Sequence, residues 1–271
     1  MILSLVTADV WQARWAADAG VERILVDLEG FTKDERQQGR GLFRSNHSLD
    51  DLGAIRAACP RTSVTVRVNS IHDGSAEEIG AVAAHAPARI MLPWIRSADE
   101  IDRFLELVPP GVEPVLLLEN RWSLGFLPEI LRNLPVREVY IGLNDLSLDL
   151  GLRNFAQTLL HQSFRSAIHR LCDRDRLWGF GGVGDFRDRS LPIAPEAFFL
   201  FQVRLGSGSG WLSRSFRKML DEDGGGENAA FTLARIRDGE GRVAAESAER
   251  RRASIAAFEQ ILAQVADVTM Y

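Results

Sequence analysis

One stretch of sequence decides the fold: Glu138-Val139-Tyr140-Ile141-Gly142-Leu143-Asn144-Asp145. It is a largely apolar run typical of a buried strand, followed by a glycine turn and a single carboxylate, Asp145. About one strand–helix unit earlier, the apolar run Val115-Leu116-Leu117-Leu118 ends on a second carboxylate, Glu119. Short, nearly continuous apolar runs are typical of strands buried on both faces of a parallel sheet. The two runs therefore predict neighbouring parallel strands, each with an acidic group at its end.

Strand and helix patterns alternate along most of the chain. Segments with helical spacing separate the strands, and some have start signals, such as Ser48 ahead of Asp50-Asp51. We expect eight strands, at Ile2–Val6, Arg23–Leu28, Ser63–Val68, Arg89–Leu92, Pro114–Leu118, Glu138–Gly142, Leu177–Gly181 and Phe198–Leu205. Eight strand–helix units predict an α/β fold of the (β/α)8 type, a TIM barrel, with a doubly wound open sheet as the alternative.

The composition changes after the predicted eighth strand. The acidic, glycine-rich run Asp221-Glu222-Asp223-Gly224-Gly225-Gly226-Glu227 is typical of a solvated link. From Val243 onward the spacing is that of an amphipathic helix, with Phe258 and Leu262 on its apolar face. We therefore expect a barrel over residues 1–220, a flexible link over 221–242 and an additional C-terminal helix over 243–271. That helix either caps the bottom of the barrel or packs on a neighbouring subunit.

Composition and charge indicate a soluble, cytoplasmic protein. The 271-residue chain has a net charge of −5, which gives no electrostatic reason to expect a nucleic-acid or anionic-membrane partner. No uncharged apolar run approaches membrane-spanning length, and the first residues lack the basic region of a signal peptide. Cys59 and Cys172 are far apart in sequence, so we expect free thiols in a reducing compartment. The expected partners are a small-molecule substrate and further copies of the chain.

Polar residues follow the predicted strands at their C-terminal ends, which form the active face of a TIM barrel. A glycine-rich loop, Gly206-Ser207-Gly208-Ser209-Gly210, follows the predicted eighth strand and is expected at the same face. It either binds phosphate through its backbone N–H groups or forms only a tight turn. The side chains expected to meet at this face are Asp27, Glu29, Arg67, Asn69, Pro93, Trp94, Glu119, Asn120, Asn144 and Asp145.

Glu119 and Asp145 each have two interpretations. Either carboxylate alone can cap the helix that follows it, because an acidic group near a helix N-terminus is favourable. Two buried acidic groups at neighbouring strand ends are costly unless a cation meets them, which favours a shared divalent metal site. Ligands that are all oxygen atoms indicate Mg²⁺ or Mn²⁺, and no pair of histidines has the spacing of zinc ligands.

Arg67 and His47 also leave alternatives open. Arg67 either pairs with Glu29 or binds a substrate carboxylate or enolate, which a guanidinium can grip through two hydrogen bonds. His47 lies in the loop after the second strand and is either a general base or a surface histidine beside a helix start. The same loop either suits an acidic substrate or presents an exposed basic face, through Lys33, Arg36, Arg40 and Arg44.

Five short motifs follow the predicted strands in order: Asp27-Leu28-Glu29, Arg67-Val68-Asn69, Met91-Leu92-Pro93, Leu118-Glu119-Asn120 and Gly142-Leu143-Asn144-Asp145-Leu146-Ser147. In these motifs the chain resembles the HpcH/HpaI aldolase and citrate lyase β-subunit superfamily, over nearly the whole predicted barrel. The Gly-x-Asn-Asp-Leu-Ser motif is the most specific of them. The resemblance implies a TIM barrel of the phosphoenolpyruvate-binding type and a homo-oligomer, often one that exchanges a C-terminal helix between subunits.

The resemblance also implies an activity. Glu119 and Asp145 are expected to bind Mg²⁺ or Mn²⁺, and Arg67 to hold a pyruvate-like or acyl carboxylate or its enolate. The implied reaction is that of a metal-dependent, class II type aldolase, a carbon–carbon lyase that cleaves or forms a 2-oxo acid aldol through a metal-stabilised pyruvate enolate. The alternative is a CoA-thioester lyase of the citrate or malyl-CoA lyase type.

The expected proton carrier is missing from this site. Asp27 and Glu29 are expected to orient the arginine or metal-bound water, and Asn144 to lie beside the substrate. In the pyruvate aldolases that the chain resembles, a histidine follows the Asp-x-Glu motif and acts as acid and base, and in the citrate lyase branch this residue is usually Asp. Here it is Gly30. Three alternatives follow: His47 replaces it, a metal-bound water does so, or the barrel binds a 2-oxo acid with little or no turnover.

Overall fold

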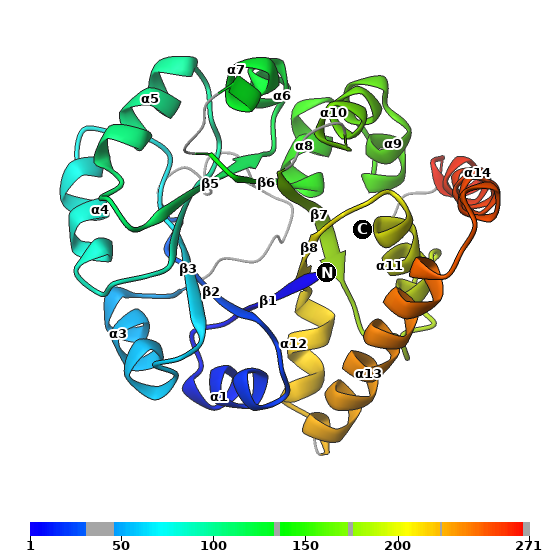
Figure 1. The fold of residues 1–271 in the computed structure, drawn as a ribbon, viewed down its shortest axis with the longest axis horizontal. Helices are drawn as coiled ribbons and strands as arrows, with labels where there is room; N and C mark the ends of the chain where they lie inside the picture. The colour runs from blue at the N-terminus through cyan, green and yellow to red at the C-terminus, as the bar shows by residue number, and fades with distance from the viewer. Residues whose placement is uncertain (31–45, 133–135, 173–175, 223, 268–271) are drawn as a thin grey trace.

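Over the residues that the computed structural model describes (1–30, 46–132, 136–172, 176–222 and 224–267), eight parallel strands close into a barrel (Figure 1). Each strand pairs with the next along the chain, and β8 pairs with β1. The predicted TIM barrel is confirmed, and the open sheet is excluded. The strands are β1 Ile2–Val6, β2 Arg23–Asp27, β3 Ser63–Arg67, β4 Arg89–Leu92, β5 Glu113–Leu118, β6 Glu138–Ile141, β7 Leu177–Val183 and β8 Ser209–Leu212.

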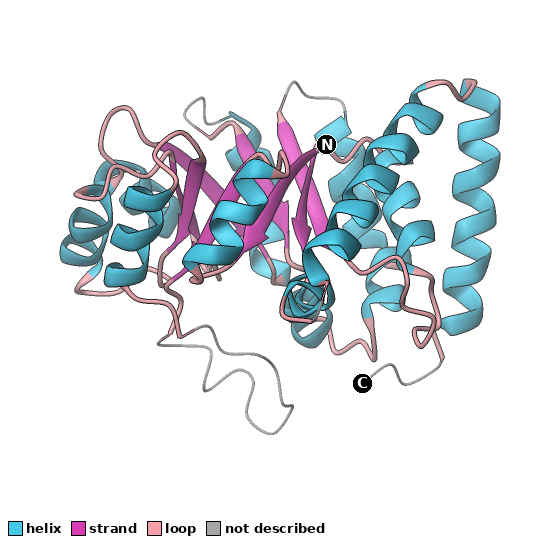
Figure 2. Cartoon of the chain, turned by 90° about the horizontal axis from the view of Figure 1, so that it is seen from below, coloured by secondary structure: helices cyan, strands magenta, loops and turns pink. Residues whose placement is uncertain are grey.

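Helices surround the strands on the outside of the barrel (Figure 2). Their starts follow the sequence signals: Ser48 and Asp51 form a capping box at α3, and Ser97 caps α5. In the described part of the chain, no helix has the length and apolar character needed to cross a bilayer. The helices are α1 Val10–Asp18, α3 Leu49–Ala58, α4 Ser75–Ala83, α5 Ala98–Leu107, α6 Arg121–Gly125, α7 Leu127–Arg132, α8 Leu143–Asp149, α9 Phe155–Leu160, α10 Gln162–Cys172, α11 Pro195–Arg204, α12 Arg214–Leu220, α13 Gly225–Ala244 and α14 Ala248–Val265.

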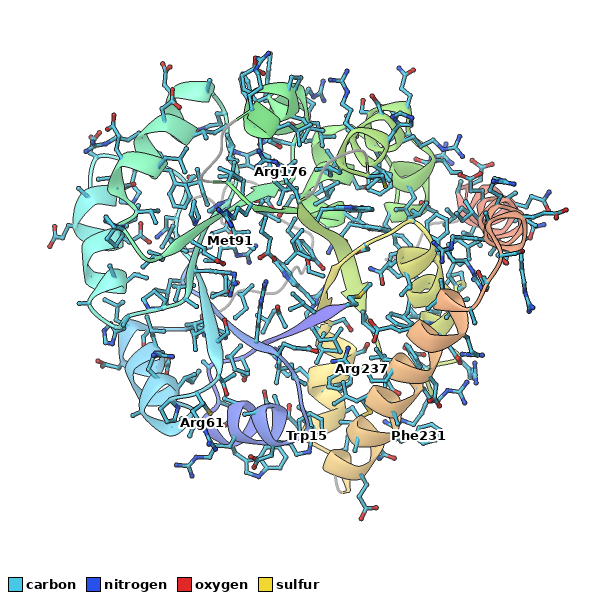
Figure 3. All side chains as sticks on the ribbon, viewed as in Figure 1. Trp15, Arg61, Met91, Arg176, Phe231 and Arg237 are labelled. Carbon is cyan, nitrogen blue, oxygen red and sulfur yellow. The ribbon has the colours of Figure 1, made fainter. Side chains whose placement is uncertain are left out.

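The interior of the barrel has a small core of its own, separate from the larger core between strands and helices. Figure 3 shows the side chains that fill the barrel, with Met91 among them. At the N-terminal end of the barrel, Glu138 accepts hydrogen bonds from Nη1 of Arg23 at 2.7 and 2.8 Å and lies 3.4 Å from Nε of Arg89. These three residues begin β6, β2 and β4, so an ion-pair cluster fills the bottom of the barrel.

The eighth strand was predicted in the wrong place. Phe198–Arg204 lies in helix α11, Leu205 is its C-cap, and β8 is Ser209–Leu212. A short apolar run fits a buried helix as well as a buried strand, and Pro195 occupies the first turn of α11, where proline is favourable. The glycine-rich loop therefore comes before β8, at the bottom of the barrel. There Gly208 bonds to the backbones of Trp178 and Ile2, so its expected place at the active face is wrong.

The flexible link expected over 221–242 is also wrong, since most of it is helix α13. The glycines that indicated flexibility serve close packing instead. A Cβ atom on Gly225 would lie 2.1 Å from the carbonyl oxygen of Met219, and Gly224 has φ +70°, which favours glycine. Leu233 and Ile236, among others, bury the inner face of α13.

The C-terminal helix α14 begins at Ala248, after a turn that ends α13. It packs against α9 and α11 of its own chain (Figure 1). Phe258 and Leu262 are buried, and Phe258 stacks on Phe201 with ring centroids 4.5 Å apart. Packing of this helix on a neighbouring subunit stays a prediction.

Candidate functional site

A cavity of about 490 Å³ opens among the C-terminal ends of the strands. It lies at the face where TIM barrels carry their active sites. The residues that the sequence singled out but that do not line the cavity are Glu29, His47, Asn69, Pro93, Trp94 and Asn120. The lining includes Asp27, Arg67, Glu119, Asn144 and Asp145.

Arg67 is held by an ion pair with Asp27. The two residues end β3 and β2 and lie opposite each other in the strand register. Nε and Nη2 of Arg67 donate to Oδ1 and Oδ2 of Asp27 at 2.8 and 2.7 Å, and Nη1 lies 3.4 Å from Oε2 of Glu29. Burial opposes the charge on Arg67, but the carboxylates of Asp27 and Glu29 hold its pKa well above the ordinary value. The guanidinium is therefore charged and fixed.

Two aromatic side chains support this arginine from inside the barrel. The guanidinium carbon of Arg67 lies 5.7 Å from the ring centroid of Trp211, within cation–π range. Trp211 stacks on Tyr140 with centroids 4.3 Å apart, and its backbone N–H donates to the Tyr140 hydroxyl at 2.9 Å. That hydroxyl donates in turn to the carbonyl oxygen of Gly181. Because burial raises the pKa of Tyr140 well above its usual range, it is a neutral structural donor.

Glu119 follows β5 and is positioned by two local features. The backbone N–H of Trp94 donates to its Oε1 at 3.1 Å, and Trp94 takes a left-handed conformation with φ +48°. Such strain in a non-glycine residue is often found at functional sites. On the other side lies Gly142, where a Cβ atom would come within 2.9 Å of both Cβ and Oε2 of Glu119. Only glycine leaves room for the carboxylate in this position.

Asp145 and Asn144 are carried by α8, which begins directly after the Gly142 turn. Asp145 is 8 % exposed and Glu119 is 2 % exposed, and both carboxylates line the cavity. Asn144 is exposed at its rim. The two acidic strand ends therefore line one cavity, and their joint binding of a cation stays a prediction.

These two carboxylates fit a hard divalent cation. Within the described residues, no group of three or more His, Cys, Asp or Glu side chains is placed to hold a metal ion. Mg²⁺ and Mn²⁺ do not need such a group, since they are commonly held by one or two carboxylates, with water and substrate oxygens completing the shell. Two carboxylates therefore suit Mg²⁺ or Mn²⁺ better than zinc, and binding of a metal by Glu119 and Asp145 stays a prediction.

His47 and Gly30 lie beside Asp27 and Arg67. The backbone N–H of Asp27 donates to Nδ1 of His47 at 3.0 Å, so the proton of the neutral imidazole is on Nε2. Burial lowers the pKa of His47, as does Arg217, while Asp27 acts in the opposite direction. Gly30 donates its N–H to Oδ1 of Asn69 at 2.8 Å, and within the described part of the chain a Cβ atom there would meet nothing closer than 4.0 Å. The basic residues predicted between Gly30 and His47 lie outside the described residues.

Some polar residues expected at the site have structural roles. Asn120 caps α6 through a capping box with Ser123 and donates Nδ2 to the carbonyl oxygen of Ile95. Asn69 bonds to Glu78 through its backbone N–H and its side chain. Neither asparagine lines the cavity.

Several residues that line the cavity were not predicted from the sequence. Trp211, Arg214 and Arg217 follow or end β8, which had been placed too early in the chain. The run Ser209–Leu212 is short and glycine-containing, so it lacks the apolar pattern of a barrel strand. An eighth strand predicted after helix α11 would have brought these three residues to the cavity.

Solved structures share this architecture. The HpcH/HpaI aldolase from Desulfitobacterium hafniense is 16 % identical, with a TM-score of 0.60 over 82 % of this chain and 90 % of that chain. The chain has the fold of HpcH/HpaI aldolases. An HpcH/HpaI aldolase/citrate lyase family protein from Burkholderia cenocepacia is 14 % identical, with a TM-score of 0.60 over 82 % of this chain and 92 % of that chain.

A citrate synthase, SbnG, is also similar, at 13 % identity and a TM-score of 0.54 over 86 % of this chain and 94 % of that chain. At the level of sequence, no family model and no curated protein matches. The likeness predicted from the strand-end motifs is thus confirmed for the fold, at identities that carry no detail of the reaction.

Proposed function

We propose that the chain is a divalent-metal-dependent carbon–carbon lyase that cleaves or forms an aldol of a 2-oxo acid. One observation carries this proposal: the fixed cation Arg67 and the two buried carboxylates Glu119 and Asp145 line the same cavity at the active face. A 2-oxo acid carries a carboxylate and a carbonyl oxygen side by side, which are the groups that such a set of charges recognises.

In this proposal, Glu119 and Asp145 hold Mg²⁺ or Mn²⁺, which supplies a Lewis acid to stabilise negative charge on the substrate's carbonyl oxygen. Arg67 binds the carboxylate or the developing enolate. Its Nε and one N–H of Nη2 are already bonded to Asp27, so the substrate takes the remaining N–H groups on Nη1 and Nη2. The ion pair with Asp27 orients the guanidinium before the substrate arrives, which lowers the entropy lost on binding.

The proton transfer is the open part of this chemistry. Nδ1 of His47 accepts from the backbone of Asp27, and Nε2 then carries a proton, so His47 acts as a base only if that hydrogen bond breaks. Gly30 supplies no side chain. These two features favour a second candidate function, a barrel that binds a 2-oxo acid and turns it over slowly or not at all.

Solvent deuterium exchange into the methyl group of pyruvate separates the two candidates. A lyase exchanges this group in the presence of Mn²⁺ and fails to do so without metal, and Glu119→Gln with Asp145→Asn abolishes the exchange. Asp102→Asn, which changes an exposed carboxylate on α5 outside the cavity lining, serves as the control and leaves the rate unchanged. Absence of exchange at saturating Mn²⁺, with pyruvate still bound, would establish the binding function instead.

A further inference from the structure

The cavity has a second wall that the 2-oxo acid chemistry does not use. This apolar wall is formed by the residues that follow β6 and β7. It comprises Leu143, Phe155, Leu191, Ile193, Pro195 and Phe198. Helix α8 joins the two parts of the cavity, because Leu143 and Asp145 lie two positions apart on it and both line the space.

The apolar wall is rigidly built. The ring of Phe198 contacts Phe155, Phe180 and Phe258, with centroids 5.5, 6.0 and 6.5 Å away. Phe258 belongs to α14, so the additional C-terminal helix supports the wall from behind. Aromatic contacts of this kind hold side chains in fixed positions.

Gly181 allows this wall to close. It has φ +63°, and a Cβ atom there would lie 3.0 Å from Cζ of Phe198 and 3.1 Å from Cδ1 of Leu143. A side chain at this position would push the two apolar residues apart. The absence of a side chain at Gly181 therefore lets Leu143 and Phe198 both pack over β7 where they line the cavity.

The size of the cavity leaves room for a second molecule at this wall. Its volume of about 490 Å³ lies within the range of about 300–1,000 Å³ that holds whole drug-sized ligands. A three-carbon 2-oxo acid bound at Arg67 fills only part of it. A charged or strongly polar group placed against the apolar wall would lose its hydration without gaining partners there.

We propose that the wall binds the side chain of the second substrate, and that this substrate is an aldehyde with an apolar side chain. The inference rests on the proposed lyase function and adds the class of the aldehyde. In the condensation direction, the methyl carbon of the 2-oxo acid loses a proton and forms a bond to the aldehyde carbon. The aldehyde oxygen gains a proton and becomes the hydroxyl of the product, so no oxidant or reductant is needed.

The test compares kcat/KM for condensation of pyruvate with ethanal, propanal, butanal and pentanal, and with succinic semialdehyde as an acidic aldehyde. We expect kcat/KM to rise about four-fold for each added methylene until the wall is filled. Arg214 and Arg217 also line the cavity, and a preference for succinic semialdehyde would assign the aldehyde to them and overturn the proposal.

Leu191 gives a variant suited to this test, because it is 50 % exposed and its replacement leaves the core intact. Leu191→Asp should lower kcat/KM for pentanal at least ten-fold and flatten the dependence on chain length. The matched control is Leu49→Asp, because Leu49 is 37 % exposed and lies outside the cavity. This variant should change neither kcat/KM for pentanal nor the dependence of kcat/KM on chain length. If Leu191→Asp and Leu49→Asp lower kcat/KM for pentanal equally, the apolar wall does not bind the side chain of the aldehyde.

Pyruvate methyl exchange, which needs no aldehyde, is measured on the same preparations. If methyl exchange occurs but kcat/KM stays constant or falls as the aldehyde chain lengthens, the apolar wall is not the aldehyde site and the lyase proposal still stands. Absence of exchange overturns the lyase proposal and this inference with it.

Discussion

The guanidinium of Arg67 and the carboxylate of Asp27 face each other across the ends of β3 and β2 and form a buried pair with two hydrogen bonds, at 2.8 and 2.7 Å. This pair fixes the only cationic side chain that the strand-end motifs supply to the cavity. We expect Asp27→Asn to loosen Arg67 and weaken pyruvate binding in the presence of Mn²⁺ about 10- to 100-fold, because a hydrogen bond to a charged group contributes about 1.5–3 kcal/mol.

Calorimetric titration with pyruvate measures this effect. The matched control is Asp185→Asn, since Asp185 binds Arg187 through a similar pair at the exposed surface. An exposed pair of this kind contributes at most about 1 kcal/mol to stability, and this one lies outside the cavity. Equal pyruvate affinity in wild type and Asp27→Asn would show that the pair does not position Arg67 for substrate.

Gly142→Ala should displace Glu119. The added Cβ atom would lie 2.9 Å from both Cβ and Oε2 of Glu119, closer than real contacts allow, so the carboxylate must move. We expect the affinity for Mn²⁺ to fall at least ten-fold, as measured by titration followed by electron paramagnetic resonance. Gly80→Ala is the control, because a Cβ atom there has open space on helix α4. A Mn²⁺ affinity that is the same in Gly142→Ala and Gly80→Ala would remove Glu119 from the metal site.

Gly30→His should increase pyruvate methyl exchange. Among the described residues, a Cβ atom on Gly30 would meet nothing closer than 4.0 Å. A correctly placed general base contributes about 10²- to 10⁴-fold, so a rise of that size would show that the wild-type site lacks a base. Gly30→Ala fills the same backbone position without a base and should leave the rate unchanged. If neither variant alters the exchange rate, the proton carrier lies elsewhere in the cavity.

His47 should make stability depend on pH. Burial lowers the pKa of His47 below the ordinary value of about 6.5, so the folded chain binds a proton there less readily than the unfolded chain. The contribution of the neutral imidazole is therefore complete above pH about 6.5, and it is lost as the pH falls from there to the folded pKa. As the pH falls between these two values, the free energy of unfolding measured in urea should decrease more for wild type than for His47→Asn. Parallel losses would show that His47 titrates equally in both states.

Glu138→Ala should destabilise the barrel. Its carboxylate meets Arg23 and Arg89 at the bottom of the barrel, and removing it leaves a buried cation without its partner. The expected loss is about 3–5 kcal/mol of unfolding free energy. Glu113→Ala removes an exposed carboxylate from the same cluster, 2.5 Å from Arg89, and should cost at most about 1 kcal/mol. Similar losses in the two variants would mean that burial does not set the strength of this cluster.

Much of this fold is visible in the sequence because the strands of a TIM barrel are buried on both faces. The runs that became β2, β3, β5 and β6 are largely apolar and buried in their middle, and the polar residues at or just after their C-terminal ends mark the active face. The run from Phe198 was wrongly predicted as a strand for a physical reason: its four consecutive apolar residues, Phe198 to Phe201, suit a buried helix equally well. The error moved β8 and hid Trp211, Arg214 and Arg217.

Side-chain contacts between neighbouring strands were harder to predict from the sequence than the positions of the strand ends. The sequence placed Asp27 and Arg67 at the same face, but their pairing depends on the register of β2 against β3, which no local pattern specifies. The support of Glu119 by Trp94 depends on a left-handed backbone in a residue that seldom adopts one. The link at Gly224–Gly226 was misjudged because glycine serves close packing as well as flexibility.

The most direct test of the account is whether Glu119 and Asp145 together hold a divalent cation. Titration of the purified chain with Mn²⁺, followed by electron paramagnetic resonance of the free ion, measures this without any assumption about the substrate. We predict a single Mn²⁺ per chain in wild type, weaker binding in Glu119→Gln and in Asp145→Asn, and loss of the site when both are changed. Undiminished binding of Mn²⁺ by the double variant would contradict the central claim.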